Sequence, residues 1–295
     1  METTALLDAE GRVVHETHSA PVAWWSFTKA LLAASAVKLS SEGRIDLDSA
    51  MDDPRYTLRQ TLTHTAGLSD YGDLPEYHSA VAAEEPPWSD AEILSRTRAE
   101  HLLYAPGSDW RYSNIGYLLA RRRIESLTGR TLEQLLRDLV FDPLGLTRSK
   151  LAETTQDMAG LAHPPPHTYD PAWVFHGVAI GPASDAARCL HAILVGPLLT
   201  EAARSQLLAL RPIGGAIPGR PWSTTGYGLG LMIGEMQSSE GSEGLPAIGH
   251  SAGGPGSAGA VFRFGSGDRA STVAVFGAYG DAAPAEFEAL RMALG

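Results

Sequence analysis

The sequence predicts an α+β fold, in which an α/β lobe with an antiparallel sheet flanked by helices is joined to an all-helical lobe. Segments of strand-like texture lie near both ends of the 295-residue chain, whereas the middle follows a helical rhythm. The length fits two small domains or one large two-lobed domain. We therefore expect one two-lobed domain over residues 1–295, with the α/β lobe at about 1–56 and 175–295 and the helical lobe at about 57–174.

The first expected elements are a hairpin and a helix. Residues 3–7 and 12–16 are short β-prone runs on either side of a turn that contains Gly11, which predicts the hairpin. From Ser26 to Leu39 apolar residues recur at the 3.6-residue spacing of a helix, and Gly43 follows where a C-cap is expected.

Helical patterns continue through the middle of the chain, and strands return after it. We expect helices at about 57–63, 89–98, 114–128, 131–140, 184–194 and 200–209, strands at 227–233, 259–264 and 272–278, and a closing amphipathic helix at 283–294. The hairpin then joins the C-terminal strands in one antiparallel sheet. The two lobes leave a cleft between them, which is the usual place for a site.

Composition narrows the range of partners. Lys and Arg number 23 against 34 Asp and Glu, and the formal net charge of −11 repels phosphate backbones and anionic lipid head groups. We therefore expect no nucleic-acid partner and no membrane partner.

Cys189 is the only cysteine, so an intrachain disulfide or a thiolate metal cluster is impossible, and we expect it to be an inert part of the core. The first ten residues lack the basic segment of a signal peptide, which favours a cytoplasmic protein.

Two serines are candidate nucleophiles. Ser251, in Gly249-His250-Ser251-Ala252-Gly253, matches the G-x-S-x-G elbow of α/β-hydrolases. That fold needs a histidine after the serine, and all ten histidines lie at or before position 250. We therefore reject Ser251 as the nucleophile.

Ser26 is the better candidate, because Lys29 follows it one helical turn later. Positions i and i+3 share a helix face, so the Lys29 amine can take the Ser26 proton once the amine is neutral. Partial desolvation near the positive end of a helix lowers the pKa of such an amine toward about 7 to 8. The free N–H groups of the first turn can supply one half of an oxyanion hole. Taken alone, S-x-x-K is a common chance match, and an N-cap serine beside a solvated lysine is the simpler alternative.

Two further motifs follow Ser26 along the chain. Tyr112-Ser113-Asn114 lies on a loop that enters the helix expected at 114–128, where Tyr112 can relay a proton and Asn114 can hold a substrate carbonyl. His250-Ser251-Ala252 and the glycines after it lead toward the strand at 259–264, and can form a wall against which a substrate backbone lies. Each motif alone is better explained by a capping turn or a hairpin.

Together, the three motifs resemble those of the serine β-lactamase and penicillin-binding-protein superfamily, in particular its class C branch with esterases and D-Ala-D-Ala carboxypeptidases. Other segments resemble that branch too, among them residues 58–68, 104–107, 143–146 and 227–230. The likeness covers about residues 25–265. It implies the β-lactamase/transpeptidase-like fold, with an α/β lobe formed by both chain ends, an all-helical lobe and the site in the cleft between them.

The resemblance also implies roles for individual residues. Ser26 is expected to be the acylated nucleophile, Lys29 its base, and Tyr112 the group that relays protons to the leaving group and from the deacylating water. Asn114 is expected to contact the substrate, and the oxyanion to lie between the N–H groups of Ser26 and Gly253. No metal or organic cofactor is expected, because an acyl-enzyme route needs only proton transfers and an anion cradle.

Two departures from the family pattern bear on the substrate. His250 stands where many relatives have lysine, and a histidine near its unperturbed pKa of about 6.5 is mostly neutral at pH 7, so it anchors an anionic substrate weakly. Ala252 replaces the usual glycine, for which Gly253 compensates only through a shift of one residue. We expect His250, Ser251 and Gly253 to contact the substrate, and Trp25 to line an acyl pocket.

The remaining histidines have simpler explanations. His64 is expected to be a structural histidine bonded to the backbone. His163, His167 and His176 could be imagined as a metal set, but prolines between the first two preclude a helix, and we expect a surface loop there.

The leading hypothesis is a serine hydrolase that forms an acyl-enzyme on Ser26, a carboxylesterase acting on a small ester. D-amino-acid peptidase or amidase, β-lactamase and acyltransferase are alternatives within the family. A catalytically silent, penicillin-binding-like protein that keeps the cleft is the alternative of another class. The expected partner is a small-molecule ester or amide, and the sequence leaves the oligomeric state open.

Overall fold

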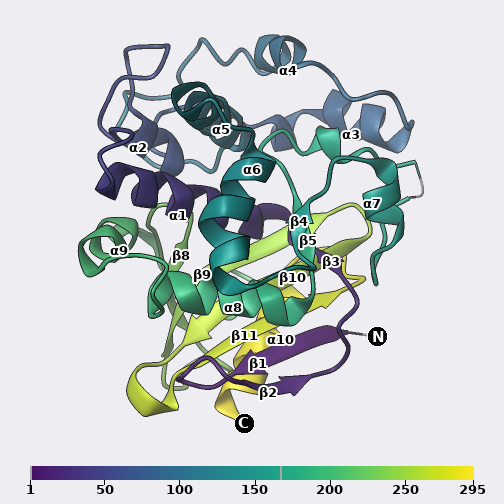
Figure 1. The fold of residues 1–295 in the computed structure, drawn as a ribbon, viewed down its shortest axis with the longest axis vertical. Coiled ribbons are helices and arrows are strands. Elements are labelled where there is room, and N and C mark those ends of the chain that lie inside the picture. Colours follow the sequence, from purple (N-terminus) through teal and green to yellow (C-terminus); the bar gives the residue numbers. More distant parts are fainter. Residues whose placement is uncertain (1, 167) are drawn as a thin grey trace.

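An eight-stranded antiparallel sheet forms the base of the molecule in the computed structural model, which describes residues 2–166 and 168–295 (Figure 1). The strand order is β2-β1-β11-β10-β9-β8-β7-β6. The strands are β1 (Thr3–Leu7), β2 (Val13–Glu16), β6 (Arg211–Gly214), β7 (Trp222–Tyr227), β8 (Met232–Met236), β9 (Leu245–Gly254), β10 (Ser257–Phe264) and β11 (Ser271–Gly277). Because β1 pairs with β11, with Thr3 opposite Phe276, the prediction that the N-terminal hairpin joins the C-terminal strands is confirmed.

Helices cover both faces of this sheet. α10 (Ala283–Leu294) packs on β10 and β11, and α8 (Ala183–Leu194) packs on β1, β10 and β11 from the opposite side (Figure 1). Along β11, Val273 and Val275 belong to the core beneath α10, whereas Ala274 and Phe276 belong to the core beneath α8. This alternation is the two-residue period of a strand, and it explains why every residue of β11 is buried.

α1 (Thr28–Ser41) is the central helix, and all its residues from Thr28 to Val37 are buried. Figure 1 shows α2 to α5 on the side of α1 that faces away from the large sheet. Gly43, with φ of +70°, follows the end of α1 as expected. The other helices are α2 (Leu58–Leu62), α3 (Pro75–Ala82), α4 (Asp90–Arg96), α5 (Asn114–Thr128), α6 (Leu132–Leu136), α7 (Thr155–Ala159) and α9 (Glu201–Leu207).

A small second sheet holds the chain just before α1. Its order is β3-β5-β4, formed by β3 (Val22–Ala23), β5 (Ala179–Gly181) and β4 (Lys150–Leu151). Directly after β3, the Trp24 N–H donates to the Ala179 carbonyl at 2.8 Å. These strands are too short to show a periodic pattern, so the sequence carries no signal for them.

The prediction of a single strand at 227–233 is wrong. β7 ends at Tyr227 and β8 begins at Met232, and the Gly228 N–H closes the turn between them on the Leu231 carbonyl at 2.9 Å. Gly230 in this turn has φ of +69°, and a Cβ there would lie 2.6 Å from the Lys29 carbonyl oxygen, so the turn needs glycine to pack against α1. The elements α3, α7, β6 and β9 also fall outside the expected helices and strands.

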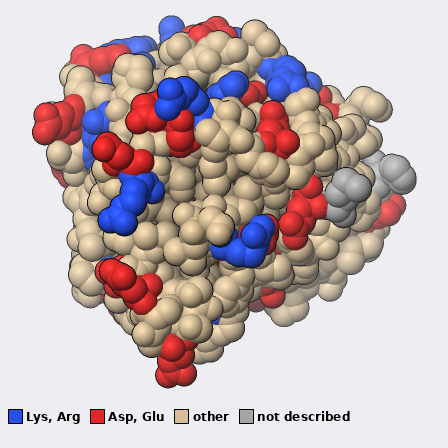
Figure 2. Space-filling model, turned by 90° about the horizontal axis from the view of Figure 1, so that it is seen from below, with Lys and Arg blue, Asp and Glu red and all other residues tan. Residues whose placement is uncertain are grey.

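Charged side chains of both signs lie side by side on the face seen in Figure 2, with uncharged surface between them. Among the described residues, none of the helices combines the length and the apolar character needed to cross a bilayer. The expected lobe boundaries near residues 56 and 174 stay a prediction.

Candidate active site

Ser26 lies in a 3₁₀ turn, η1 (Trp25–Phe27), between β3 and α1. The α-helix therefore begins two residues later than expected, at Thr28. Trp25 has φ of +39°, an uncommon conformation for a bulky residue, and its Nε1–H donates to Ser257 Oγ on β10 at 3.0 Å. The turn buries both neighbours of Ser26 and leaves Ser26 itself partly exposed at the start of α1.

The Lys29 amine lies beneath Ser26 and is fully buried, with 0% of the residue exposed. Its Nζ is 3.2 Å from Ser26 Oγ and 2.7 Å from Asn114 Oδ1. Burial lowers the pKa of Lys29 well below its usual value, and the nearby Asp70 carboxylate opposes this shift. The amine is therefore placed, and shifted in the right direction, to act as a base toward the serine.

Tyr112 contacts the same oxygen from another side, with Oη 2.9 Å from Ser26 Oγ. Burial raises the pKa of Tyr112, so the phenol keeps its proton and donates it to Ser26 Oγ. The serine's own hydrogen is then free to point at the Lys29 lone pair. The Ser26 hydroxyl thus lies between an amine that can accept its proton and a phenol that can donate one.

Asn114 lies at the first position of α5 and orients Lys29. Its Nδ2 donates to Asp70 Oδ2 at 3.2 Å, which fixes the amide so that Oδ1 faces Lys29. Asp70 also accepts the Asn114 backbone N–H at 2.8 Å, and burial raises the pKa of its carboxyl. No sequence motif pointed to Asp70, because it becomes a neighbour of Asn114 only when the segment before α3 folds against α5.

The expectation of a surface loop around the later histidines is wrong for two of them. His176 is buried, and its Nε2 lies 3.0 Å from Lys29 Nζ. His163 is also buried, with Nε2 3.1 Å from Thr3 Oγ1. His167 lies outside the described residues. Prolines near His163 suggested an exposed loop, but the segment from 171 to 181 leads back into β5 and carries His176 beneath Ser26.

A chain of hydrogen bonds lies behind Tyr112 and joins α5 to the large sheet. The Ser113 N–H donates to His64 Nδ1 at 3.1 Å, so His64 Nε2 carries the proton and donates to Tyr227 Oη at 3.2 Å. The Tyr227 hydroxyl donates to His250 Nε2 at 3.0 Å. His250 Nδ1–H donates to the Ser251 carbonyl at 2.5 Å. The bond from Ser113 confirms that His64 is bonded to backbone.

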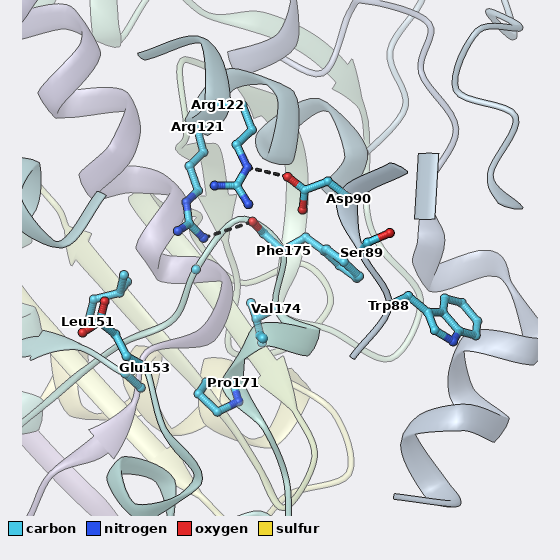
Figure 3. A pocket seen from close by; sticks show the side chains of 13 residues that line it. Trp88, Ser89, Asp90, Arg121, Arg122, Leu151, Glu153, Pro171, Val174 and Phe175 are labelled. Carbon is cyan, nitrogen blue, oxygen red and sulfur yellow. Dashed lines mark hydrogen bonds and ion pairs between the residues drawn. The ribbon is translucent and has the colours of Figure 1, made fainter. Parts of the chain in front are cut away.

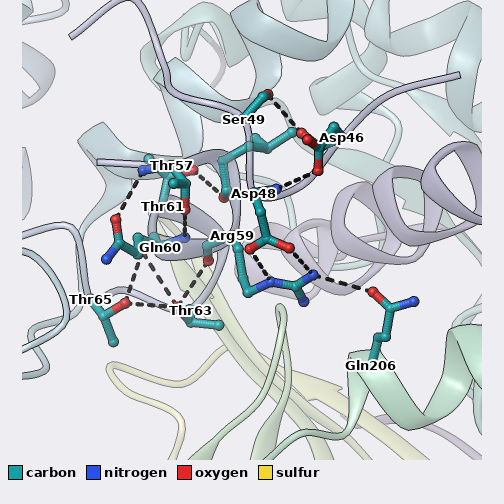
Figure 4. A network of polar contacts seen from close by, with 11 residues as sticks. Asp46, Asp48, Ser49, Thr57, Arg59, Gln60, Thr61, Thr63, Thr65 and Gln206 are labelled. Carbon is teal, nitrogen blue, oxygen red and sulfur yellow. Dashed lines mark hydrogen bonds and ion pairs between the residues drawn. The ribbon is translucent and has the colours of Figure 1, made fainter. Parts of the chain in front are cut away.

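The segment around His64 is held by the polar network shown in Figure 4. Thr57 and Gln60 form a capping box at the start of α2. After α2, the hydroxyls of Thr63 and Thr65 lie 2.9 Å apart on either side of His64, whose φ is +58°. The tight turn and these bonds point the imidazole toward Tyr227.

His250 carries no charge in this arrangement. Its residue is 2% exposed, and burial, with a smaller effect of Lys29, lowers its pKa to about 3. Both ring nitrogens already have partners in the hydrogen-bond chain. The imidazole is therefore neutral at physiological pH, and even less suited to anchor an anion than its unperturbed pKa suggested.

Ser251 points to the opposite face of β9 from His250, as the strand alternation requires. Its hydroxyl donates to Glu286 on α10 and accepts from Arg220 Nη2 at 3.0 Å. Glu286 is 0% exposed and pairs with Arg220. Ser251 therefore lines the site while its hydroxyl is bound to the buried Glu286 and the partly exposed Arg220. The sequence holds no local signal for this partnership.

Two cavities meet at Ser26. The first, here called the Tyr112 cavity, has a volume of about 530 Å³, and its walls include Tyr112, Ile213, Ile217, Arg220, Met232 and His250. The second, here called the Asn114 cavity, has a volume of about 430 Å³, and its walls include Trp25, Tyr71, Tyr77, Asn114, Tyr169 and His176. Ser26 and Gly253 line both cavities.

Gly253 lies on the part of β9 that extends past β8. β8 pairs with β9 only over Leu245–Gly249, so β8 leaves the next residues of β9 unpaired on that side. Ala252 is buried against the core, whereas Gly253 is exposed. Ala252 is therefore a buried part of the wall of the Tyr112 cavity, whereas Gly253 lines both cavities.

Solved structures share this fold. A D-stereospecific amidohydrolase from Streptomyces superposes with a TM-score of 0.75 at 24% identity, covering 97% of this chain and 90% of that one. The D-amino acid amidase from Ochrobactrum anthropi, in complex with D-phenylalanine, gives a TM-score of 0.79 at 18% identity, covering 99% and 92%. The β-lactamase/transpeptidase-like fold predicted from the motifs is confirmed.

Curated relatives match shorter stretches. A D-aminopeptidase of Cereibacter sphaeroides is 32% identical over 107 residues, which is 36% of this chain and 20% of that protein. The lovastatin esterase of Penicillium rubens is 32% identical over 126 residues, 41% of this chain and 31% of that protein. The matches thus span less than a third of each relative. The family model described as Beta-lactamase, in contrast, matches residues 8–293, and the chain therefore belongs to the beta-lactamase family.

Proposed function

We propose that this protein is a carboxylesterase that forms an acyl-enzyme on Ser26. One observation carries the proposal: the partly exposed Ser26 Oγ has Lys29 Nζ at 3.2 Å and Tyr112 Oη at 2.9 Å. A base and an acid on either side of a hydroxyl are what acyl transfer to a serine requires. The similarity to a D-aminopeptidase and to a lovastatin esterase supports the same class of reaction.

The proton movements follow from this arrangement. Ser26 Oγ attacks the ester carbonyl while its proton passes to Lys29 Nζ, and Tyr112 gives its proton to the departing alkoxide as the C–O bond breaks. Water then attacks the acyl carbon and gives a proton to the Tyr112 phenolate, while Lys29 returns its proton to Ser26 as the acid leaves. The sum is ester plus water to acid plus alcohol, and both groups return to their starting state.

The oxyanion is proposed to bind the N–H groups of Ser26 and Gly253. Ser26 lies in the first turn before α1, where backbone N–H groups have no helical partner. Gly253 faces it from the extended part of β9 and lines both cavities. Two such donors stabilise the developing charge in the transition state, each by about 3 kcal/mol.

Each cavity holds one half of the substrate in this proposal. The leaving oxygen has to approach Tyr112 Oη to receive a proton, so the alcohol half occupies the Tyr112 cavity. The acyl half then occupies the Asn114 cavity on the other side of Ser26. Ile213, Ile217 and Met232 make the first cavity largely apolar, and tyrosines line the second.

Charge favours a neutral substrate. His250 is neutral, and the only Arg or Lys among the described residues of the Tyr112 cavity, Arg220, is already paired with Glu286. An anionic β-lactam or a peptide C-terminus therefore lacks a free cationic partner there. Among the described residues that line the Asn114 cavity there is no carboxylate for the ammonium group of a D-amino acid.

A second candidate is hydrolysis of D-amino-acid amides, which the similarity to a D-aminopeptidase and a D-amino acid amidase favours. Purified protein is tested on a neutral p-nitrophenyl or alkyl ester, a D-amino-acid amide, a D-Ala-D-Ala peptide and a chromogenic cephalosporin. We expect the neutral ester to give the highest kcat/KM, and Ser26→Ala to abolish its turnover. Ser95→Ala is the matched control, because that serine is exposed on α4 and lines neither cavity.

Several results would overturn the proposal. Faster turnover of the D-amino-acid amide would favour the amidase, and faster turnover of the cephalosporin would favour a β-lactamase. Binding of all four compounds with no product would indicate a catalytically silent binding protein. An ester or amide product formed with an added alcohol or amine in preference to water would indicate an acyltransferase.

A further inference from the structure

His176 is the buried group beside Lys29 that the steps above do not use. Its residue is 3% exposed, and Lys29 Nζ lies 3.0 Å from its Nε2 and 3.4 Å from its Nδ1. Burial is the main reason that the pKa of His176 is well below its usual value. The imidazole is therefore neutral. Because Nζ is at similar distances from both ring nitrogens, it lies over the ring, which can accept an amine hydrogen there.

Counting the hydrogens on Nζ shows what the His176 ring does. A neutral amine has two hydrogens and one lone pair, and Lys29 Nζ has three polar neighbours. Asn114 Oδ1, fixed by Asp70, can only accept and takes the first hydrogen at 2.7 Å. If His176 takes the second, the lone pair is left for Ser26 Oγ. Without His176, the amine can rotate and point a hydrogen at the serine instead.

We infer that His176 is a positioning residue for Lys29, which accepts one amine hydrogen and thereby directs the amine lone pair at Ser26 Oγ. The inference deepens the proposed function and rests on it. An uncharged acceptor suits this place, because a carboxylate so close would hold Lys29 in its protonated form. The polar and titratable groups around Lys29 include Ser26, His64, Asp70, Tyr112, Asn114, Tyr117, His176 and His250.

The backbone on the far side of His176 is held in place, as a positioning role requires. Figure 3 shows Arg121 of α5 reaching the Phe175 carbonyl, which accepts from Nη1 at 3.3 Å. Gly177 has φ of +88°, and its N–H donates to the Val174 carbonyl at 2.6 Å. A Cβ on Gly177 would lie 2.6 Å from Leu132 Cδ2. The turn therefore has little room to move the imidazole away from Lys29.

The test measures the rate at which a fluorophosphonate labels Ser26, as a function of pH, in the full chain. His176→Leu keeps an apolar filling but removes the acceptor, and His176→Gln keeps an acceptor. The labelling rate should rise with pH and then reach a plateau. We expect this plateau rate to fall about 10- to 100-fold in His176→Leu. In His176→Gln it should stay within about threefold of wild type. With a neutral ester, the loss in His176→Leu should appear in kcat rather than in KM.

His163→Leu is the matched control, because it replaces another buried histidine that touches Thr3 rather than the site. It should label at the wild-type rate. If His176→Leu does not fold, His176→Met takes its place. Equal plateau rates in His176→Leu and wild type, or equal losses in the Leu and Gln variants, would overturn the inference while leaving the proposed function intact. Labelling that persists in Ser26→Ala would instead refute the proposed function.

Discussion

Lowering the pH should destabilise this protein through the buried histidine of β9. The folded state holds His250 neutral, with a pKa of about 3, whereas the unfolded chain restores the ordinary value of 6.5. A group whose folded pKa is lowered contributes stability above its unfolded pKa, and this contribution is lost as the pH falls. The free energy of unfolding should therefore be constant with respect to His250 above about pH 6.5 and decrease between about pH 6.5 and 3.

The size of the effect follows from the same values. At about pH 5 the unfolded imidazole is about 1.5 pH units below its pKa, while the folded imidazole stays neutral. At about 1.4 kcal/mol per pH unit, the free energy of unfolding falls by about 2 kcal/mol through this one group. His64 and His176 are also buried with lowered pKa values, so the wild type should lose more in total.

Urea unfolding at about pH 7.5 and about pH 5 measures this contribution in wild type and in His250→Gln. Glutamine does not titrate, so the stability difference between the two proteins should shift by about 2 kcal/mol in favour of the variant at the lower pH. The surface substitution His101→Gln is the control for the change of residue, since its side chain is 74% exposed. An unchanged difference between wild type and His250→Gln at the two pH values would refute the assignment of His250 as a neutral buried link.

Three further substitutions test other parts of the site. Tyr112→Phe should lower kcat/KM for an alkyl ester about 10²- to 10⁴-fold. The loss should be smaller for a p-nitrophenyl ester, because its leaving group needs no proton. Equal losses on both esters would contradict the role of Tyr112 as an acid. Arg220→Ala leaves the fully buried Glu286 without its partner and should reduce the free energy of unfolding by about 3 kcal/mol, measured in urea, whereas adding Glu286→Gln should restore most of it. Gly230→Ala places a methyl group 2.6 Å from the Lys29 carbonyl and should lower both Tm and esterase activity; an unchanged Tm would show that the turn adapts.

Much of the fold was predictable because long elements carry strong periodic patterns. α5, α8 and α10 have nearly the bounds that their apolar spacing indicates, and the two ends of the chain share one sheet. Elements shaped by tertiary contacts were not predictable. The apolar residues at 227–233 predict one strand. The structure instead has a turn at Gly230, because this segment packs against α1. β3, β4 and β5 are too short for any pattern.

The residues of the site, too, include some that the sequence predicts and some that it does not. Ser26, Lys29 and Tyr112 were found because the helical spacing and three ordered motifs mark them, and the structure brings their polar atoms together. Asp70 and His176 were missed, because each is far from the motifs in sequence and reaches Lys29 or Asn114 only through folding. A lone buried histidine among prolines has no signature that separates it from a loop histidine.

The most direct test of the central claim is the mass of the intact protein shortly after mixing with a neutral p-nitrophenyl ester. An acyl-enzyme on Ser26 predicts a transient increase equal to the acyl group, located on the peptide that contains Ser26 and absent in Ser26→Ala. An adduct that maps to Ser251, or one that forms equally in Ser26→Ala, would contradict it.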